Sequence, residues 1–236
     1  EWIINGEKIF VTTGCRCEGV VVWATLDRSA GRAGIKSFLI EKGFKGFSTA
    51  QKLDKLGMRG SDTCELVFQD CEVPEENVLG DVGRGVNVLM SGLDYERVVL
   101  AAGPLGIMQA CMDVVVPYMH ERKQFGQPIG DYQLIQLKLA RMEVARLNLE
   151  NLVFRYIESQ AAGRELSLAE ASAMKLYAAQ TAMEVSTEAV QVCGGAGYMR
   201  ETRVEQLMRD AKILQIYAGT DEMQVVAIAR DLLGRA

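Results

Sequence analysis

Hydrophobic and polar positions follow two different periods along the chain, one before about residue 82 and one after it. In the first part, short runs rich in β-branched and aromatic residues are separated by Gly, Asp and Pro, which is typical of strands joined by turns. We expect strands at 20–24, 36–40 and 64–68, and a further pair at the start with Asn5-Gly6 as the turn. Residues 1–82 therefore predict an antiparallel sheet domain.

After residue 82, turn signals become rare and apolar residues recur at three- and four-residue intervals. This pattern predicts long helices at about 84–120, 131–161, 167–192, 203–216 and 220–233, separated by Gly- and Pro-containing stops. Strands followed by helices indicate a sheet domain packed against a helical bundle, not an alternating α/β fold. We therefore predict an α+β protein with a β domain over 1–82 and a C-terminal helical bundle over 83–236.

Composition excludes several classes of protein. With 236 residues, 49% of them hydrophobic and 24% charged, the chain lies in the globular range, so disordered and fibrous classes are excluded. The 31 acidic and 26 basic residues give a net charge of −5, which argues against nucleic acid as a partner. Arg97, Gln109 and Asp113 bracket the most apolar stretch, so we expect no membrane span.

The cysteines and the histidine suggest no metal site. The six cysteines lie far apart except for Cys15-x-Cys17, and His120 is the only histidine. Spacing therefore assembles no zinc-like ligand set. Free thiols in a reducing compartment are the preferred interpretation over disulfides.

Glu96 is the first candidate for chemistry. If the segment is helical, Glu96 shares a face with Leu89, Leu93, Leu100 and Gly103, so we expect its carboxylate to face the core. Burial disfavours the ionised form of a carboxylate and makes it a competent base near neutral pH. The alternative is a structural ion pair. Asp94 and Arg97 lie on an adjacent face, where they could pair with each other or meet a polar ligand.

Three further segments have both structural and functional interpretations. The glycines of 193–197 could let a backbone approach phosphate, but a dinucleotide fingerprint follows a strand, so we expect a helix end and a tight link. In the link 217–222, Thr220 or Asp221 could cap the next helix, or backbone N–H groups could hold an oxyanion or phosphate. The basic segment 120–126 complements a helix dipole without needing a ligand.

Six short motifs occur in order along essentially the whole chain. They are Ile4-Asn5-Gly6-Glu7-Lys8, Lys52-Leu53-Asp54-Lys55-Leu56-Gly57-Met58-Arg59-Gly60, Arg122-x-Gln124-Phe125-Gly126, Gln191-x-x-Gly194-Gly195-x-Gly197-Tyr198, Arg209-Asp210-Ala211-Lys212 and the 217–220 link. Taken together, they resemble the acyl-CoA dehydrogenase family of flavoproteins. Each motif is short, but their occurrence in this order is specific.

The resemblance implies a particular fold and assembly. Family members have an N-terminal helical domain, a middle β domain and a C-terminal four-helix bundle, which surround FAD and a CoA thioester. This chain matches the later part of the β domain and the whole bundle, so we expect the rest to lie upstream of it. The resemblance further implies a homotetramer built as a dimer of dimers, with electron-transfer flavoprotein as electron acceptor. The expected compartment is the bacterial cytoplasm, or the mitochondrial matrix in a eukaryote.

The resemblance also implies a reaction and a base. A carboxylate removes the α proton of an acyl-CoA thioester while hydride leaves the β carbon for flavin N5, giving a 2-enoyl-CoA. Many members carry the base in the link, at the position of Ala218, which cannot accept a proton. The subgroup of isovaleryl-CoA and long-chain acyl-CoA dehydrogenases instead has an E-R pair on the long helix, which matches Glu96-Arg97. The resemblance therefore selects the same glutamate as the helical pattern.

Other site residues follow from the resemblance alone. Phe10 is expected to lie against the flavin and Thr12 near flavin N5. The Ala218 N–H matches the donor to the thioester carbonyl, and Asp94, Arg97, Leu100 and Tyr217 match substrate-side positions. A Tyr at 217 resembles the long-chain type, whereas isovaleryl-CoA dehydrogenases have Gly there. The remaining cofactor residues are Arg122, Gln124, Phe125, Gln191 and Gly195 toward a neighbouring subunit's FAD, and Thr220 and Glu222 toward the FAD of their own subunit.

Two alternative functions remain open from the sequence. The same fold hosts acyl-CoA oxidases and flavin monooxygenases, which differ in how the flavin is reoxidised. The chain could also act as a non-catalytic oligomerisation fragment, since the helical bundle makes most subunit contacts in the family.

Overall fold

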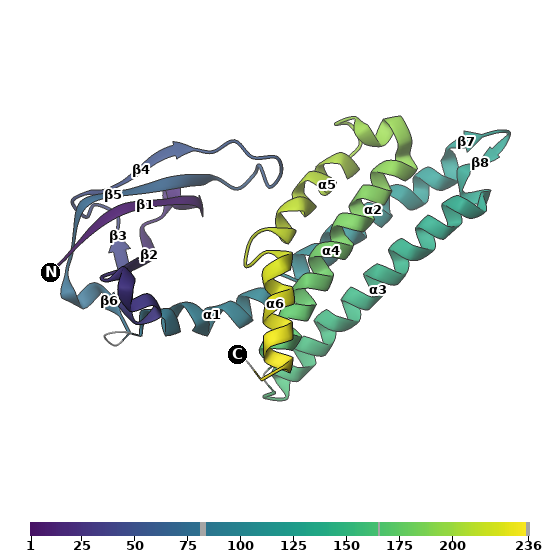
Figure 1. Ribbon diagram of the computed structural model, residues 1–236. Coiled ribbons are helices and arrows are strands. Elements are labelled where there is room, and N and C mark those ends of the chain that lie inside the picture. Colours follow the sequence, from purple (N-terminus) through teal and green to yellow (C-terminus); the bar gives the residue numbers. More distant parts are fainter. Residues whose placement is uncertain (81–83, 165, 235–236) are drawn as a thin grey trace. The chain divides into compact units, whose positions relative to one another are not determined.

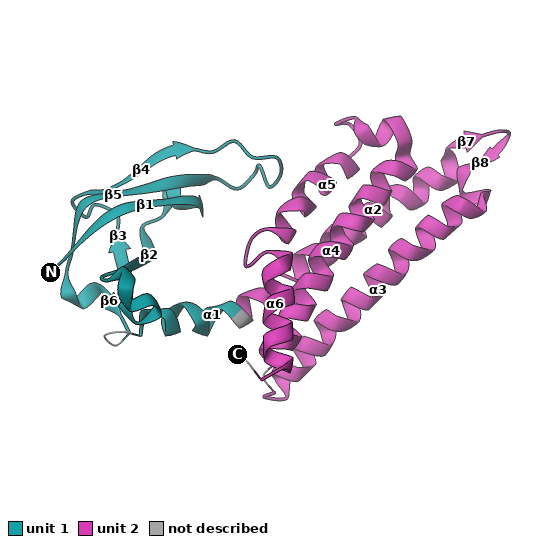
Figure 2. Cartoon of the chain, viewed as in Figure 1, with its two compact units in different colours: residues 1–93 teal, residues 94–236 magenta. Residues whose placement is uncertain are grey.

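The computed structural model describes residues 1–80, 84–164 and 166–234. The chain forms two compact units, residues 1–93 and 94–236, each with its own hydrophobic core (Figure 2). The predicted domain boundary between residues 82 and 83 falls on a segment, 81–83, that lies outside the described residues. The predicted α+β class is confirmed, with antiparallel strands in the first unit and helices in the second (Figure 1).

The first unit contains two antiparallel three-stranded sheets. One sheet has the order β1-β5-β4, formed by β1 (Trp2–Thr12), β5 (Thr63–Val73) and β4 (Phe47–Lys52). The other has the order β2-β3-β6, formed by β2 (Gly19–Thr25), β3 (Ile35–Glu41) and β6 (Val78–Leu79). Short 3₁₀ turns η1 (Gly14–Arg16), η2 (Arg28–Gly34) and η3 (Glu75–Asn77) connect them.

Alternating side chains of these strands form the core of the first unit. Phe38 and Ile40 are two residues apart on β3 and both are buried, as is Leu66 on β5. The Trp2 ring meets Phe38 edge-on, with centroids 6.0 Å apart. The β-rich runs that predicted the strands therefore supply the residues that pack inward.

The predicted turn at Asn5-Gly6 is wrong, because β1 runs straight through these residues. The register against β5 shifts between Ile4 and Gly6, which marks a β-bulge. Asn5 Oδ1 accepts a hydrogen bond from the Asp70 N–H at 2.8 Å, and Asn5 Nδ2 donates to Asp70 Oδ1 at 3.1 Å. Gly6 has φ of 144°. Pairing with a strand more than sixty residues away thus overrides the local turn preference.

The second unit is a helical bundle around α4. The long helices after α1 (Gly85–Val99) are α2 (Ala102–Glu121), α3 (Gln133–Ala161), α4 (Leu168–Cys193), α5 (Val204–Lys212) and α6 (Asp221–Leu232). The short elements are the hairpin β7 (Lys123–Gln124) and β8 (Gln127–Pro128), and the turns η4 (Ile129–Asp131), η5 (Gly194–Tyr198) and η6 (Ile213–Gln215). α4 packs against α2, α3, α5 and α6. A capping box between Ser167 and Glu170 fixes its start.

The helix predicted at 84–120 is two helices with a turn at residues 100 and 101. Pro104 explains the break. In an unbroken helix its ring would clash with the carbonyl of Leu100, four residues earlier, and its missing N–H would leave that carbonyl without a partner. In the first turn of α2 that N–H is not needed, so the helix restarts at Ala102.

The stretch Gly85–Glu121 is long and apolar enough to cross a membrane by length and composition. The sequence expectation that no segment meets this criterion is therefore not met. In the bundle, however, the α2 side chains of Met108, Cys111 and Val115 are fully buried against neighbouring helices. Helices in protein cores have the same composition as membrane spans, so core packing accounts for the apolar character of α2.

The start of α1 is anchored on the second sheet through Gly85. Its carbonyl accepts hydrogen bonds from Trp23 Nε1 at 3.1 Å and Ser37 Oγ at 2.9 Å. A Cβ atom at Gly85 would lie 2.6 Å from both the Ile35 carbonyl oxygen and the Lys36 Cα. Only glycine fits this approach, so this residue sets how α1 leaves the sheet.

We predict that Gly85→Ala destabilises the first unit by about 2 kcal/mol, because the added methyl overlaps backbone atoms that cannot move aside. Urea unfolding followed by tryptophan fluorescence measures this, since both tryptophans, Trp2 and Trp23, lie in the first unit. Gly92→Ala is the matched control in the same helix. A Cβ there meets nothing within 4 Å, so the change should stabilise by up to about 1 kcal/mol. Equal midpoints for the two variants would contradict the close approach.

Candidate functional site

The link between η6 and α6, residues 216–220, has an unusual backbone. Ala218 has φ of 51° and Gly219 has φ of 88°, so two consecutive residues are left-handed. This conformation costs an alanine roughly 1–2 kcal/mol. The strain at Ala218 must therefore be offset by the contacts that hold the link.

Two buried side chains provide those contacts. Gln224 of α6 is fully buried, and its Nε2 donates to the Ala218 carbonyl at 2.9 Å and to the Gly219 carbonyl at 3.0 Å. Lys175 of α4 is also buried, and its Nζ donates to the Gly219 carbonyl at 2.8 Å. The carbonyl groups of Ala218 and Gly219 are thereby hydrogen-bonded to side chains of the bundle core.

The Ala218 N–H is in a different position. Within the described part of the chain, no group accepts a hydrogen bond from it. The Ala218 and Gly219 carbonyls thus accept hydrogen bonds, whereas the Ala218 N–H donates none within the described part of the chain. A backbone amide fixed in this way is the type of group that stabilises a developing oxyanion.

Charged groups of both signs lie around Lys175 and shift its pKa in opposite directions. Burial lowers the pKa of Lys175 below its usual range, and the Arg97 guanidinium adds to the lowering. The Asp221 carboxylate, with Oδ1 3.9 Å from Nζ, opposes this effect. Asp221 is itself fixed by Gln215 Nε2, which donates to its Oδ2 at 2.9 Å.

Thr220 and Glu222 occupy the start of α6. The Thr220 hydroxyl accepts a hydrogen bond from the Met223 N–H at 3.3 Å, so it caps the helix as predicted. Hydrogen bonds from its own backbone N–H and from the Thr220 hydroxyl lower the pKa of the exposed Glu222 carboxyl. Glu222 therefore presents a carboxylate to solvent beside the link.

Glu96 is exposed, which corrects the expectation that it faces the core. Leu89 and Leu93, which precede Glu96 on the predicted stripe, are themselves only half-buried, and in the last turn of α1 Val98 is the buried residue. Burial raises the pKa of Tyr217, and the negative charge of Glu96 raises it further, so the two side chains interact electrostatically. Among the described residues Glu96 has no ion-pair partner, which argues against the structural ion-pair alternative.

Three of the other predicted substrate-side residues, Leu100, Tyr217 and Arg97, are related to the link through Lys175. Leu100 and Tyr217 are half-buried and line a narrow hollow together with Lys175. Arg97 is half-buried, and its charge acts on Lys175. The Asp94 side chain lies outside what the structure describes.

A second hollow, of about 450 Å³, lies at the C-terminal end of α4. Three predicted cofactor residues, Arg122, Gln124 and Gly195, line it, with Tyr118, Ile129, Val192, Cys193, Gly194 and Ala196. The Tyr118 hydroxyl donates to the Cys193 carbonyl at 3.1 Å and ties α2 to the end of α4. Cβ atoms built at Gly194 and Gly195 would meet nothing within 4 Å. An open backbone beside a guanidinium suits a phosphate-containing ligand.

Phe125 and Gln191 were predicted for the same cofactor, but they are not among the residues that line this hollow. Phe125 follows β7 in the β7–β8 hairpin, with φ of 52° and a side chain that is 94% exposed. Gln191 is exposed on the last turn of α4. Both sit next to lining residues in sequence without contributing to the wall.

Phe10 and Thr12 belong to the first unit. Phe10 has φ of 62° and is exposed, within an irregular stretch of β1 between Lys8 and Val11. Thr12 is exposed, and its carbonyl accepts from the Thr13 hydroxyl at 2.7 Å. The end of β1 therefore projects Phe10 from a locally strained backbone.

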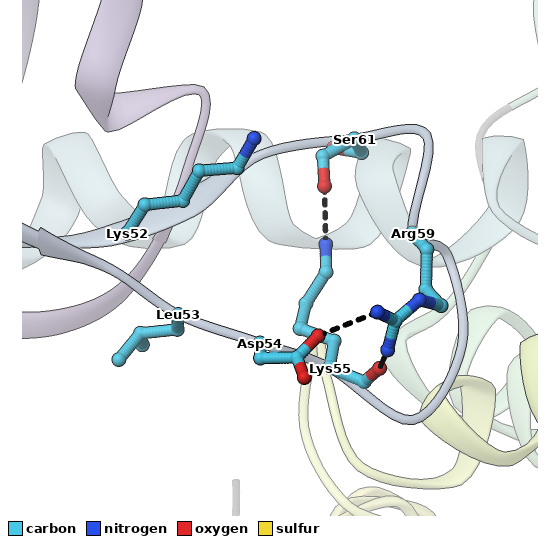
Figure 3. A pocket seen from close by; sticks show the side chains of 6 residues that line it. All are labelled: Lys52, Leu53, Asp54, Lys55, Arg59 and Ser61. Carbon is cyan, nitrogen blue, oxygen red and sulfur yellow. Dashed lines mark hydrogen bonds and ion pairs between the residues drawn. The ribbon is translucent and has the colours of Figure 1, made fainter.

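A basic hollow in the β4–β5 loop is explained by the loop itself. Figure 3 shows Lys55 and Arg59 held by neighbouring groups. Lys55 Nζ donates to the Ser61 carbonyl at 2.7 Å and to Thr63 Oγ1 at 2.9 Å, and Arg59 pairs with Asp54 at 2.8 Å. These bonds close the loop without a ligand.

Sequence reasoning missed Lys175 and Gln224. A signal was present for Lys175, because it follows Met174 on a helical face whose neighbours Ala171 and Ala178 are apolar. A lysine on a buried face requires a partner. Nothing in the pattern around Gln224 distinguishes it from a surface glutamine.

Comparison with known proteins agrees with the resemblance. Residues 1–71 match the model "Acyl-CoA dehydrogenase, middle domain", and residues 83–233 match "Acyl-CoA dehydrogenase, C-terminal domain". The chain is 51% identical over 231 residues to a mitochondrial isovaleryl-CoA dehydrogenase of Oryza sativa subsp. japonica, covering 98% of this chain and 56% of that protein. The chain thus spans just over half the length of this relative.

Solved structures give the same result. Butyryl-CoA dehydrogenase from Megasphaera elsdenii superposes with a TM-score of 0.92 at 42% identity, covering 98% of this chain and 60% of that one. A chain solved in work on the electron transferring flavoprotein of Acidaminococcus fermentans has a TM-score of 0.92 at 41% identity, with the same two coverages. The resemblance predicted from the motifs is confirmed, and the chain belongs to the acyl-CoA dehydrogenase family.

Proposed function

We propose that the protein dehydrogenates an acyl-CoA thioester between its α and β carbons, giving a 2-enoyl-CoA, with FAD as cofactor. One observation carries this proposal. The negative charge of the exposed Glu96 carboxylate acts on Tyr217, which directly precedes Ala218, and the Ala218 N–H has no acceptor among the described residues. A base and an oxyanion donor in the same region are the two groups that removal of an α proton requires.

The residues present fit FAD. The guanidinium of Arg122 and the open backbone at Gly194 and Gly195 suit the pyrophosphate and adenosine side, and we place Gln124, Phe125 and Gln191 with them. The Thr220 hydroxyl would donate a hydrogen bond to the FAD of its own subunit or accept one from it, and the Glu222 carboxylate would accept one. Phe10 and Thr12 would contact the flavin ring.

The two clusters of the bundle lie far apart on the same helix. Lys175, beside the link, and Cys193, at the second hollow, are 18 residues apart on α4, which corresponds to about 27 Å. This separation supports a role for each cluster toward a different FAD molecule. We therefore propose a homotetramer, a dimer of dimers, in which the second hollow serves a neighbouring subunit.

In the proposed reaction, Glu96 accepts the α proton of the bound thioester. The Ala218 N–H donates to the thioester carbonyl and stabilises the negative charge that develops on its oxygen. FAD, when bound, supplies the acceptor for the hydride from the β carbon. Arg97 and Asp94 would bind or orient the CoA part. The exposure of Glu96 is consistent with this role, because a base must be reachable by its substrate.

Substrate class and partners follow from the relatives and from Tyr217. Relatives act, by name, on isovaleryl-CoA and butyryl-CoA, which are branched and straight short acyl groups. The Tyr217 ring occupies space beside the link, so we propose that it limits branching next to the reacting carbons. We propose electron-transfer flavoprotein as the acceptor, supported by the related Acidaminococcus fermentans structure. The compartment would be the mitochondrial matrix or a bacterial cytoplasm.

The proposal predicts that acyl-CoA bleaches the flavin. Anaerobic addition of isovaleryl-CoA, butyryl-CoA, 2-methylacyl-CoA and long-chain acyl-CoA to the intact FAD-loaded protein should abolish the oxidised flavin absorbance with at least one thioester. Bleaching by none of them would contradict the dehydrogenase function. A stable oligomer that retains no flavin would instead support the oligomerisation fragment.

We predict that Glu96→Gln slows flavin reduction by a factor of about 10²–10⁴, because the amide cannot accept the α proton. Stopped-flow absorbance with the best thioester measures the rate, and titration with the 2-enoyl-CoA product checks that binding persists. Glu121→Gln, an exposed glutamate at the end of α2, is the matched control. Reduction by Glu96→Gln at the control rate would exclude Glu96 as the base.

We predict that Gly195→Leu weakens FAD binding at least about tenfold, since the side chain would project into open space in the second hollow. The measurement is FAD content after dialysis, together with the FAD concentration that restores flavin. Gly106→Leu on α2 is the control, because a Cβ there also meets nothing within 4 Å and Gly106 does not line the hollow. Equal FAD retention in both variants would argue against this binding site.

A further inference from the structure

Lys175 is a buried cation that the proposed reaction does not use. Its side chain is 3% exposed, and it extends from α4, where Ala171, Met174 and Ala178 are buried around it. Removing an ammonium group from water is unfavourable unless it gains hydrogen bonds and charge partners. The contacts of Nζ therefore indicate what the residue does.

Those contacts converge on the link. Lys175 Nζ donates to the Gly219 carbonyl at 2.8 Å, and Gln224 Nε2 donates to the same oxygen at 3.0 Å. Gln224 Nε2 also donates to the Ala218 carbonyl at 2.9 Å. Two side chains from different helices thus saturate the Gly219 oxygen and bridge to its neighbour.

The packing around these bonds is tight. A Cβ atom at Gly219 would lie 2.7 Å from Gln224 Nε2, so the amide group rests directly on the glycine. On the other side of Ala218, the Tyr217 N–H donates to the Ile213 carbonyl at 3.1 Å. The peptide unit that carries the Ala218 N–H therefore lies between two fixed peptide units, Ile216–Tyr217 and Ala218–Gly219, which maintain the left-handed φ of Ala218.

This arrangement bears on the Ala218 N–H. An oxyanion donor is effective when its direction is set before the substrate arrives, because no reorganisation is then needed as charge develops. We propose that Lys175 and Gln224 are positioning residues, which hold residues 218 and 219 in the left-handed conformation that presents the Ala218 N–H to the thioester carbonyl. The inference rests on the proposed function and adds two residues that do not touch the substrate.

The test uses the intact FAD-loaded protein with Lys175→Met and Lys175→Arg. The probe is bound 2-enoyl-CoA, whose carbonyl stretching frequency in difference Raman spectra falls when the oxygen accepts a stronger hydrogen bond. Lys175→Met should lose most of this frequency shift and slow flavin reduction by about 10- to 100-fold, short of the loss of a whole oxyanion donor. Lys175→Arg keeps the charge and donors and should restore part of both.

Gln224→Met is the second variant, because it removes the two bonds to the link at nearly constant volume. It should reduce the carbonyl shift in the same direction, so the proposal stays testable if Lys175→Met does not fold. Lys138→Met is the matched control. Lys138 on α3 pairs with Glu188 on α4, so its loss should lower the melting temperature without changing the carbonyl shift.

The outcomes distinguish failure of the positioning role from failure of the proposed function. If wild-type protein bleaches with acyl-CoA but Lys175→Met and Gln224→Met keep the full carbonyl shift and rate, the positioning role is overturned. An equal loss of carbonyl shift in Lys138→Met would overturn it too, since general loosening of the bundle would then suffice. If wild-type protein bleaches with no thioester, the proposed function fails instead.

Discussion

The close approach of four helices to α4 is the constraint on which the second unit depends. Small residues on α4 allow this approach, since Ala171, Ala178, Ala182 and Ala189 are buried where larger side chains would hold neighbours apart. Because the same helix carries Lys175 near one end and Cys193 at the other, its position sets both clusters of the bundle. The packing of the core around α4 therefore also sets the geometry of both clusters.

Burial of a lysine within that core links stability to the candidate site. A methionine at 175 would satisfy packing, but it could not donate to the Gly219 carbonyl. Buried polar side chains are costly unless they are satisfied, and Lys175 and Gln224 find their acceptors in a strained segment of backbone. The conformational cost of the left-handed Ala218 is thus offset by hydrogen bonds from Lys175 Nζ and Gln224 Nε2. Without these bonds, the two buried donors would have no acceptor.

Glu96 is exposed, although its position in the sequence predicted burial. Helical spacing placed it on a stripe with four apolar or small residues, but the stripe assumed one continuous helix. The helix breaks at residues 100 and 101, and within α1 the stripe residues Leu89 and Leu93 are only half-buried, so this face does not pack into the core. The residue selected as base remains the proposed one, although for its electrostatic interaction with Tyr217 and its accessibility, not for burial.

The sequence by itself determined the succession of a strand region and a helical region and the family, because these depend on local periodicity and on short motifs, and it narrowed the cap of the last helix to Thr220 or Asp221. Tertiary structure decided the bulge at Asn5, the exposure of Glu96 and the partners of Lys175. Asn5 pairs with Asp70 across 65 positions, and Lys175 reaches Gly219 across 44. Such contacts arise only when distant segments pack together, so no local pattern in the chain encodes them.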